Sequence, residues 1–91
     1  MPADYEAVRD SIYQKLLKKG WTSKRALREA KKRAAIWWYK KHPGKKFTHS
    51  DANIFSPEEL RHAQFIAAQM LVIEEKGEPL PAAYDDLKVE E

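Results

Sequence analysis

The segment Ser56-Pro57-Glu58-Glu59 is the clearest helix start in this chain of 91 residues. Serine can cap a helix, proline suits the first helical position, and a glutamate at the third position can complete a capping box. Phe55 and Leu60 are spaced to pack against each other across this start. We therefore expect a helix over about residues 57–76, ending before Gly77.

The middle of this expected helix, residues 65–73, is apolar on almost every side. An ordinary surface helix of a globular protein is apolar along one stripe only. The pattern therefore predicts either a buried central helix or an interface between copies of the protein.

Two further helices are expected earlier in the chain, over about residues 4–18 and 23–41. Gly20 suits the end of the first, and Thr22 suits the N-cap of the second. Pro43 ends the second, because the residue before a proline is displaced from helical geometry. Apolar side chains recur at helical spacing in the first helix: Tyr5, Val8, Ile12 and Leu16.

The second helix carries one main apolar face, made by Leu27, Ala30, Ala34, Trp37 and Trp38. Ile36 and Tyr39 lie off that face, so this end of the helix is apolar nearly all round. Either two elements pack against it, or it offers an exposed aromatic patch, with Tyr39 as the better candidate for exposure. We expect Trp37 and Trp38 to belong to the core of so short a chain.

These segments predict an all-α fold: a small three-helix domain over residues 1–91, with two amphipathic helices packed around the nearly apolar third. Residues 43–55 form an irregular loop, and residues 77–91 form an extended, acidic and only partly ordered tail. The chain contains no cysteine, no apolar run long enough to cross a bilayer and no signal peptide pattern, so we expect a cytoplasmic protein.

Charge is divided unevenly along the chain. Residues 1–49 carry 14 Lys or Arg against 4 Asp or Glu, a balance of +10, whereas residues 50–91 carry 3 against 10, a balance of −7. This asymmetry indicates either an anionic partner for the first half or neutralisation of one half by the other. The acidic tail is then a solubilising end or an arm that competes with phosphate.

The basic residues of the second helix favour non-enzymatic nucleic-acid binding. A row of cations along one helix suits phosphate contacts, whose affinity comes from counterion release and falls with salt. The candidate contacts are Lys24, Arg25, Arg28, Lys31 and Lys32, with Lys45 and Lys46 of the loop as a second contact. A helix-turn-helix with its turn at Gly20 fits poorly, because Glu29 falls at a position that should be apolar.

The alternative function is a protein–protein interaction module, either an inhibitor of a host protein or a homodimeric scaffold. Its basis is an excess of apolar surface over what one thin core absorbs. The candidate interface residues are Ile36, Tyr39, Phe65, Val72 and Ile73. Membrane binding is disfavoured, because the basic helix lacks a long lipid-facing stripe.

Catalysis and cofactor binding find no support in the sequence. The chain has three glycines, no phosphate-binding loop, no serine elbow and no cysteine nucleophile. His42, His49 and His62 show no metal-ligand spacing. We expect no enzyme activity, no metal, no cofactor and no small-molecule substrate.

Residues 5–42 contain Val8-Arg9-Asp10, then Lys19-Gly20-Trp21-Thr22-Ser23, then Ala26, Ala30, Ala34 and a closing aromatic pair. This pattern resembles small helical proteins encoded by bacteriophages and bacterial mobile elements. The resemblance covers under half of the chain and implies a phage-encoded accessory or host-directed protein in the bacterial cytoplasm. It assigns no functional residues.

Overall fold

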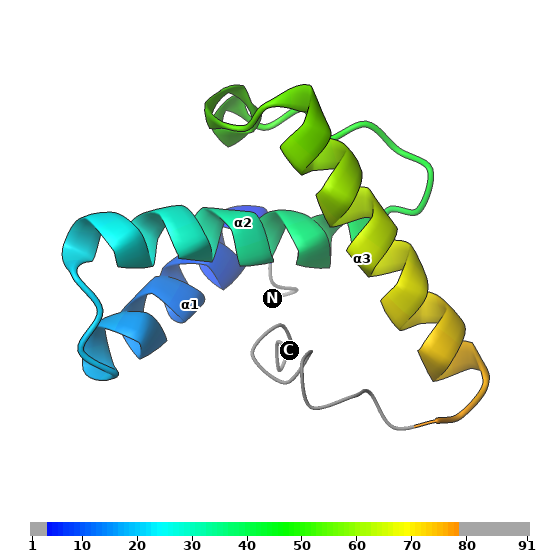
Figure 1. Cartoon of the computed structure of the whole chain (residues 1–91), viewed down its shortest axis with the longest axis horizontal. Helices are drawn as coiled ribbons and strands as arrows, with labels where there is room; N and C mark the ends of the chain where they lie inside the picture. The colour runs from blue at the N-terminus through cyan, green and yellow to red at the C-terminus, as the bar shows by residue number, and fades with distance from the viewer. Residues whose placement is uncertain (1–3, 79–91) are drawn as a thin grey trace.

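The computed structural model describes residues 4–78 and contains three α-helices and one short 3-10 helix (Figure 1). α1 spans Tyr5–Lys18, α2 spans Ser23–Lys41, η1 spans Ser50–Ile54 and α3 spans Pro57–Glu75. No strand occurs among the described residues. The predicted all-α, three-helix fold is confirmed, with helix ends within about one residue of those expected. The predicted tail lies outside the described residues from position 79 onward.

Each α-helix begins at a side chain that accepts a backbone N–H, as the sequence predicted for α2 and α3. Asp4 accepts the N–H of Ala7 at 2.8 Å, and Thr22 caps α2 in the same way. The start of α3 is a complete capping box between Ser56 and Glu59. Because these bonds satisfy N–H groups that have no partner within the helix, the helix starts are set locally.

The central helix is α2 rather than α3, so the expectation that the nearly apolar third helix lies at the centre is wrong. Both α1 and α3 pack against α2, and α3 buries only Ala63, Ala67 and Met70. Alanines line α2 where its neighbours approach, and small side chains at a contact let two helices pack closely. The buried residues of α2 are Ala26, Ala30, Arg33, Ala34, Ala35, Ile36, Trp37 and Tyr39.

Ile36 and Tyr39 are buried, with 1% and 6% of their surface exposed, so their predicted place in an exposed interface is wrong. α3 crosses the C-terminal half of α2 while α1 runs along another side of it (Figure 1). This half of α2 is therefore apolar nearly all round because two helices pack on it. Trp37 is buried as predicted, whereas Trp38 is half-buried and stacks on His42 at 4.4 Å between ring centroids.

The loop between α2 and α3 is anchored by Phe47. Its ring lies 5.0 Å from the ring of Tyr5 and 5.3 Å from that of Trp38, and it is buried. Phe55 is half-buried, whereas Ile54 is 41% exposed. Within residues 4–78, no helix has both the length and the hydropathy that crossing a membrane requires.

Candidate functional site

The connection between α1 and α2 is a tight turn of four residues. Gly20 has a φ of +94°, which an L side chain rarely adopts. The N–H of Trp21 donates to the carbonyl of Leu16 at 3.1 Å, and that of Gly20 donates to Leu17 at 3.0 Å. This is the Schellman arrangement, which satisfies the last carbonyls of a helix and reverses the chain. The end of α1 and the start of α2 therefore lie together at one end of the molecule (Figure 1).

Six cations surround this turn, and no carboxylate occurs between the first and last of them. All six are exposed, and each lies within about 9 Å of the turn along its helix axis. Lys15, Lys18 and Lys24 take part in none of the ion pairs found among residues 4–78. We call these six residues the basic tip: Lys15, Lys18, Lys19, Lys24, Arg25 and Arg28.

The basic tip contains three lysines that sequence reasoning did not assign to the site. Cations near the C-terminal end of a helix interact favourably with the helix dipole. This interaction alone accounts for the position of Lys15, Lys18 and Lys19 in the sequence. The signal that reveals them is the run of residues 15–28, which lacks Asp and Glu and continues across a helix boundary. Only the tight turn shows that both halves of this run lie at the same end of the molecule.

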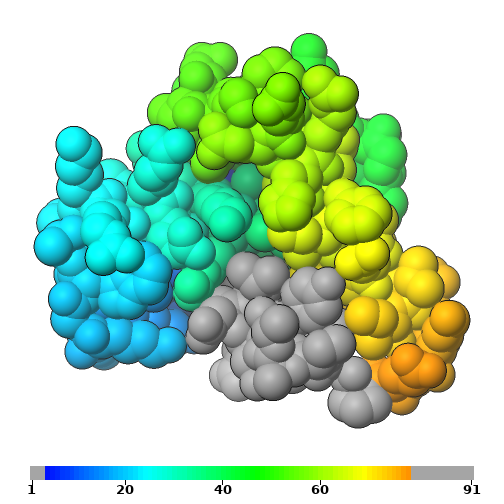
Figure 2. All heavy atoms as spheres, in the orientation of Figure 1, coloured from blue at the N-terminus to red at the C-terminus, as the bar shows by residue number. Residues whose placement is uncertain are grey.

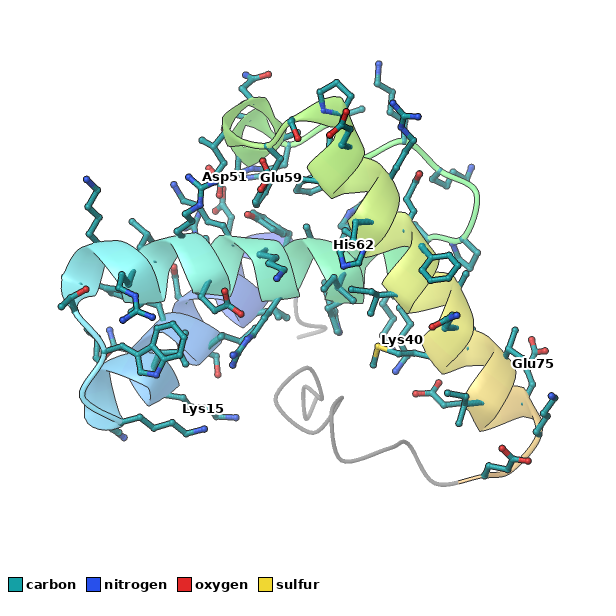
Figure 3. All side chains as sticks on the ribbon, viewed as in Figure 1. Lys15, Lys40, Asp51, Glu59, His62 and Glu75 are labelled. Atoms are coloured by element: carbon teal, nitrogen blue, oxygen red, sulfur yellow. The ribbon has the colours of Figure 1, made fainter. Side chains whose placement is uncertain are left out.

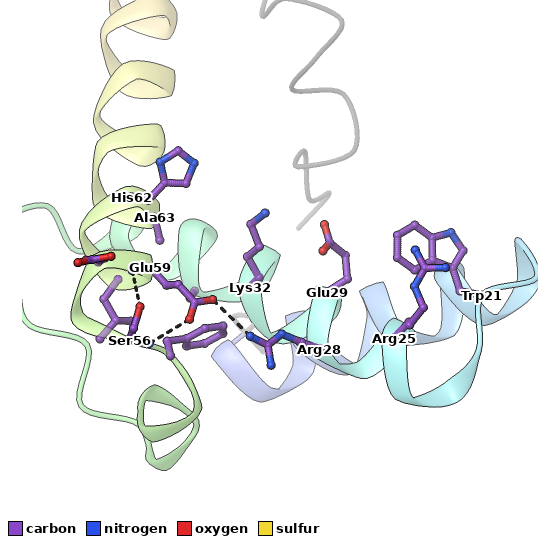
Figure 4. Close-up of a pocket in the computed structure, with 13 residues that line it drawn as sticks. Trp21, Arg25, Arg28, Glu29, Lys32, Ser56, Glu59, His62 and Ala63 are labelled. Atoms are coloured by element: carbon purple, nitrogen blue, oxygen red, sulfur yellow. Dashed lines mark hydrogen bonds and ion pairs between the residues drawn. The ribbon is translucent and has the colours of Figure 1, made fainter.

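One side of the tip opens into a groove of about 520 Å³ between α2 and the start of α3. Figure 4 shows Arg25, Arg28 and Lys32 along its α2 wall, with Glu59 and His62 on the α3 side. The same groove is visible as a notch between the cyan atoms of α2 and the yellow-green atoms of α3 in Figure 2. Its apolar lining consists of Trp21, Ala35, Phe55, Leu60 and Ala63.

The α3 wall of this groove is negatively charged, which disfavours a phosphate inside it. Glu59 accepts the backbone N–H of Ser56, and this bond, with the nearby charge of Arg28, holds the pKa of the Glu59 carboxyl below its ordinary value. The guanidinium of Arg28 lies 3.5 Å from that carboxylate. Arg28 is thus partly neutralised, and the cations best placed for an anion face outward from the tip.

Trp21 lies under cations rather than open to solvent. The guanidinium of Arg25 lies 4.9 Å from the centre of the Trp21 ring, and that of Arg33 lies 5.9 Å from it. Such contacts are favourable because the face of an aromatic ring is electron-rich. Trp21 therefore orients Arg25 at the tip, and its ring is not an open platform for stacking a base.

Lys31 points away from the tip, toward an internal carboxylate. Its ammonium lies 4.0 Å from Oδ1 of Asp51, and its side chain is 21% exposed. Asp51 also accepts the hydroxyl of Tyr5 at 2.8 Å and Nη1 of Arg9 at 2.9 Å. We call Tyr5, Arg9, Lys31, His49 and Asp51 the Asp51 cluster. Lys31 belongs to this cluster and not to the exposed row of cations in which sequence reasoning placed it.

The hydrogen bonds of Asp51 shift the pKa values of Asp51, Tyr5 and Arg9. Burial raises the pKa of Asp51, but hydrogen bonds from Tyr5 and Arg9 outweigh burial, and its pKa lies below the ordinary value. Burial, followed by the bond to Asp51, raises the pKa of Tyr5 far above its ordinary value, so the phenol stays a donor. The bond to Asp51 also raises the pKa of Arg9. The cluster ties η1 to α1 and α2, which is a structural role.

His49 connects the same region to the start of α1. Its Nε2 lies 3.0 Å from a carboxylate oxygen of Glu6, and its Nδ1 accepts the backbone N–H of Asp51 at 3.0 Å. His42 stacks on Trp38, and His62 is exposed on α3. Within residues 4–78, no three His, Asp or Glu side chains converge closely enough to hold a metal ion.

Lys45 and Lys46 are exposed, but they lie far from the basic tip. The N–H of Lys45 donates to the carbonyl of His42 at 3.1 Å, which keeps this part of the loop at the C-terminal end of α2. Arg25 lies near the other end, about 25 Å away along the helix axis at 1.5 Å per residue. The predicted second contact is therefore not continuous with the first.

Of the predicted interface residues, Phe65 and Val72 are exposed on α3, and Ile73 is half-buried. They lie on a different surface from Ile36 and Tyr39, which belong to the core. The expected patch spanning the second and third helices thus reduces to one face of α3.

Comparison with known proteins finds no match, whether to a protein-family model, a curated protein or a solved structure.

Proposed function

We propose that this protein binds nucleic acid without catalysis, through phosphate contacts made by the basic tip. The observation that carries the proposal is the run from Lys15 to Arg28, in which six exposed cations and no carboxylate are folded around one turn. Each lysine or arginine that reaches a phosphate releases condensed counterions, and this release supplies affinity independently of sequence. A cluster of such residues at one end of a compact molecule is the electrostatic footprint of a phosphate-binding surface.

The proposal concerns phosphate contact and not the reading of base edges. A helix-turn-helix protein needs an apolar residue where this chain has Glu29. The Glu29 side chain is half-buried and makes an ion pair with Arg33 one turn later in α2, at 3.0 Å, so it does not pack into an apolar contact between two helices. We expect weak sequence preference and comparable binding to duplexes of different sequence.

The resemblance of residues 5–42 to small phage-encoded helical proteins adds a setting to this proposal. A protein of that kind acts in the bacterial cytoplasm, where nucleic acid is abundant. The proposed role is an accessory protein that binds nucleic acid as a monomer or as a larger assembly.

The proposal is tested by comparing two variants that each lose two exposed positive charges. The tip variant carries Lys18→Gln and Lys24→Gln, and the loop variant carries Lys45→Gln and Lys46→Gln. Affinity for a fluorescently labelled DNA duplex is measured by anisotropy at about 0.1 M salt. Counterion release contributes about 1 kcal/mol per contact near 0.1 M salt, so the tip variant should bind at least roughly tenfold more weakly than the parent.

The loop variant is the matched control, since it changes net charge equally at the other end of α2. It should bind within about threefold of the parent, because nonlocal charge is screened over about 10 Å at 0.1 M salt. Equal losses in the two variants, or no loss in the tip variant, would show that the tip is not the binding surface. Circular dichroism of both variants confirms that the helices are retained.

A further inference from the structure

α3 carries apolar side chains on two opposite faces, and only one of them packs against the rest of the protein. Ala63, Ala67 and Met70 form the inner face and are buried. Phe65 and Val72 lie on the other side of the helix and are 58% and 48% exposed. Large apolar side chains exposed together on one helix face are typical of an interaction site.

On the exposed face of α3, two large apolar side chains lie on either side of a hollow. Phe65 and Val72 are two turns apart, about 10.5 Å along the helix axis, and the small side chain of Ala68 lies between them. A hollow of about 440 Å³ lies along this part of the helix. We call the described residues that line it the α3 stripe: Phe65, Ala68, Gln69, Val72 and Ile73.

Acidic and basic side chains flank the α3 stripe at both ends, and their order lets opposite charges meet when two copies of α3 pair in antiparallel orientation. Glu58 and Arg61 lie on the same side of the helix before the stripe, and Glu75 and Lys76 lie after it, all exposed. Figure 3 shows the side chains of α3 between His62 and Glu75, near the two ends of this surface. If two copies of α3 pair in antiparallel orientation, Arg61 approaches Glu75 of the second copy. Parallel pairing would instead place like charges together.

One antiparallel register satisfies the apolar and the charged groups together. A twofold axis at Ala68 places Arg61 level with Glu75 of the second copy, and the same axis places Phe65 within one residue of Val72 of the second copy, about 1.5 Å along the helix axis. Each Phe65 ring then enters the hollow next to Ala68 of the other copy. Such an interface is self-complementary, as a closed dimer requires.

We propose that the protein forms a twofold homodimer through antiparallel pairing of the α3 stripe. The turn between α1 and α2 lies at the opposite end of α2 from its crossing with α3 (Figure 1), so the dimer presents two basic tips. This inference does not depend on nucleic-acid binding, which a monomer performs with one tip. A single helix pair is a small interface, so the dimer should dissociate with a Kd on the order of micromolar.

Sedimentation equilibrium of the full chain over a range of concentrations tests the dimer. The parent protein should shift from monomer to dimer as concentration rises through the micromolar range, whereas Phe65→Glu should stay monomeric. Ile54→Glu is the matched control, since Ile54 is an exposed large apolar residue outside the stripe, and this variant should dimerise like the parent. A parent that stays monomeric at millimolar concentration overturns the proposal, as does a Phe65→Glu variant that still dimerises while folded.

The register is tested by cross-linking, because the natural chain has no cysteine. Ala68→Cys should be joined into a covalent dimer by a short bifunctional maleimide, whereas Ala7→Cys, exposed on α1, should not. Arg61→Glu should weaken the dimer, and adding Glu75→Arg in the same chain should restore it. Failure of both the cross-link and the restoration contradicts the antiparallel arrangement. If the monomeric Phe65→Glu variant still binds DNA, nucleic-acid binding does not require the dimer.

Discussion

Asp51 joins three parts of the chain through one carboxylate. It accepts hydrogen bonds from Tyr5 and Arg9 of α1 and attracts Lys31 of α2, while its own backbone N–H donates to His49. The partners in α1 precede it by 46 and 42 residues, so no local pattern in the sequence indicates the cluster. Long-range polar contacts of this kind arise only when the chain has folded.

Replacing Asp51 with Asn should destabilise the protein. The amide keeps one acceptor but loses the charge that Arg9 and Lys31 face, and hydrogen bonds to charged groups contribute about 1.5–3 kcal/mol each. We expect a loss of about 2 kcal/mol in the free energy of unfolding, measured with urea. Asp10→Asn is the matched control, because Asp10 also bonds Arg9 at 3.1 Å but is 64% exposed. That change should cost less than about 0.5 kcal/mol.

The contribution of Asp51 to stability should also depend on pH. Its pKa in the folded protein lies below the ordinary value of 3.8. The stabilisation is therefore complete at pH values above the unfolded pKa and is lost as pH falls below it toward the folded pKa. The difference in unfolding free energy between the parent and Asp51→Asn should be constant from neutral pH to about pH 5 and shrink below about pH 4. A difference that grows on acidification contradicts the assigned ion pairs.

At the scale of the helices, the sequence predicted where each element begins and ends but not which one is central. Caps such as Ser56 with Glu59 act within one turn and are visible in the sequence. The centre is decided by contacts between elements, and here the alanines of α2 allow two helices to approach it. The apolar character of α3 comes from two separate faces, which a count of apolar residues does not distinguish from full burial.

A larger side chain at Ala30 should separate the helices that pack on α2. Ala30 is fully buried, so Ala30→Leu overfills the core and should cost about 1–3 kcal/mol of unfolding free energy. Ala7→Leu makes the same change at an exposed position of α1 and should cost less than about 0.5 kcal/mol. Urea denaturation of both variants measures the difference. An equal effect at the two positions is incompatible with α2 as the central helix.

The candidate site was only partly predictable for the same reason. Lys24, Arg25 and Arg28 were evident from the sequence of one helix. Lys18 belongs to the same site because the turn between α1 and α2 places it nearby. Lys31 does not belong to it, because its ammonium lies close to Asp51. Periodicity within one helix cannot show either effect, since both depend on a second element.

At the scale of the whole molecule, the two oppositely charged halves of the chain partly neutralise each other. Ion pairs join Lys31 to Asp51, Arg28 to Glu59 and Lys40 to Glu74 between residues 1–49 and 50–91. These pairs lie along α2, and none of them involves Lys15, Lys18 or Lys24 of the basic tip. Part of the charge asymmetry is therefore balanced inside the molecule, and exposed cations outside these pairs remain both at the basic tip and at Lys45 and Lys46.

The most direct test of this account is the salt dependence of DNA binding by the parent and the tip variant. A plot of log affinity against log salt should be linear, with a slope that becomes shallower by about 0.9 for each phosphate contact removed. We predict that removing Lys18 and Lys24 reduces the slope by about 2, whereas the loop variant keeps the parental slope. Affinity that does not vary with salt, or an unchanged slope in the tip variant, would contradict phosphate binding by the basic tip.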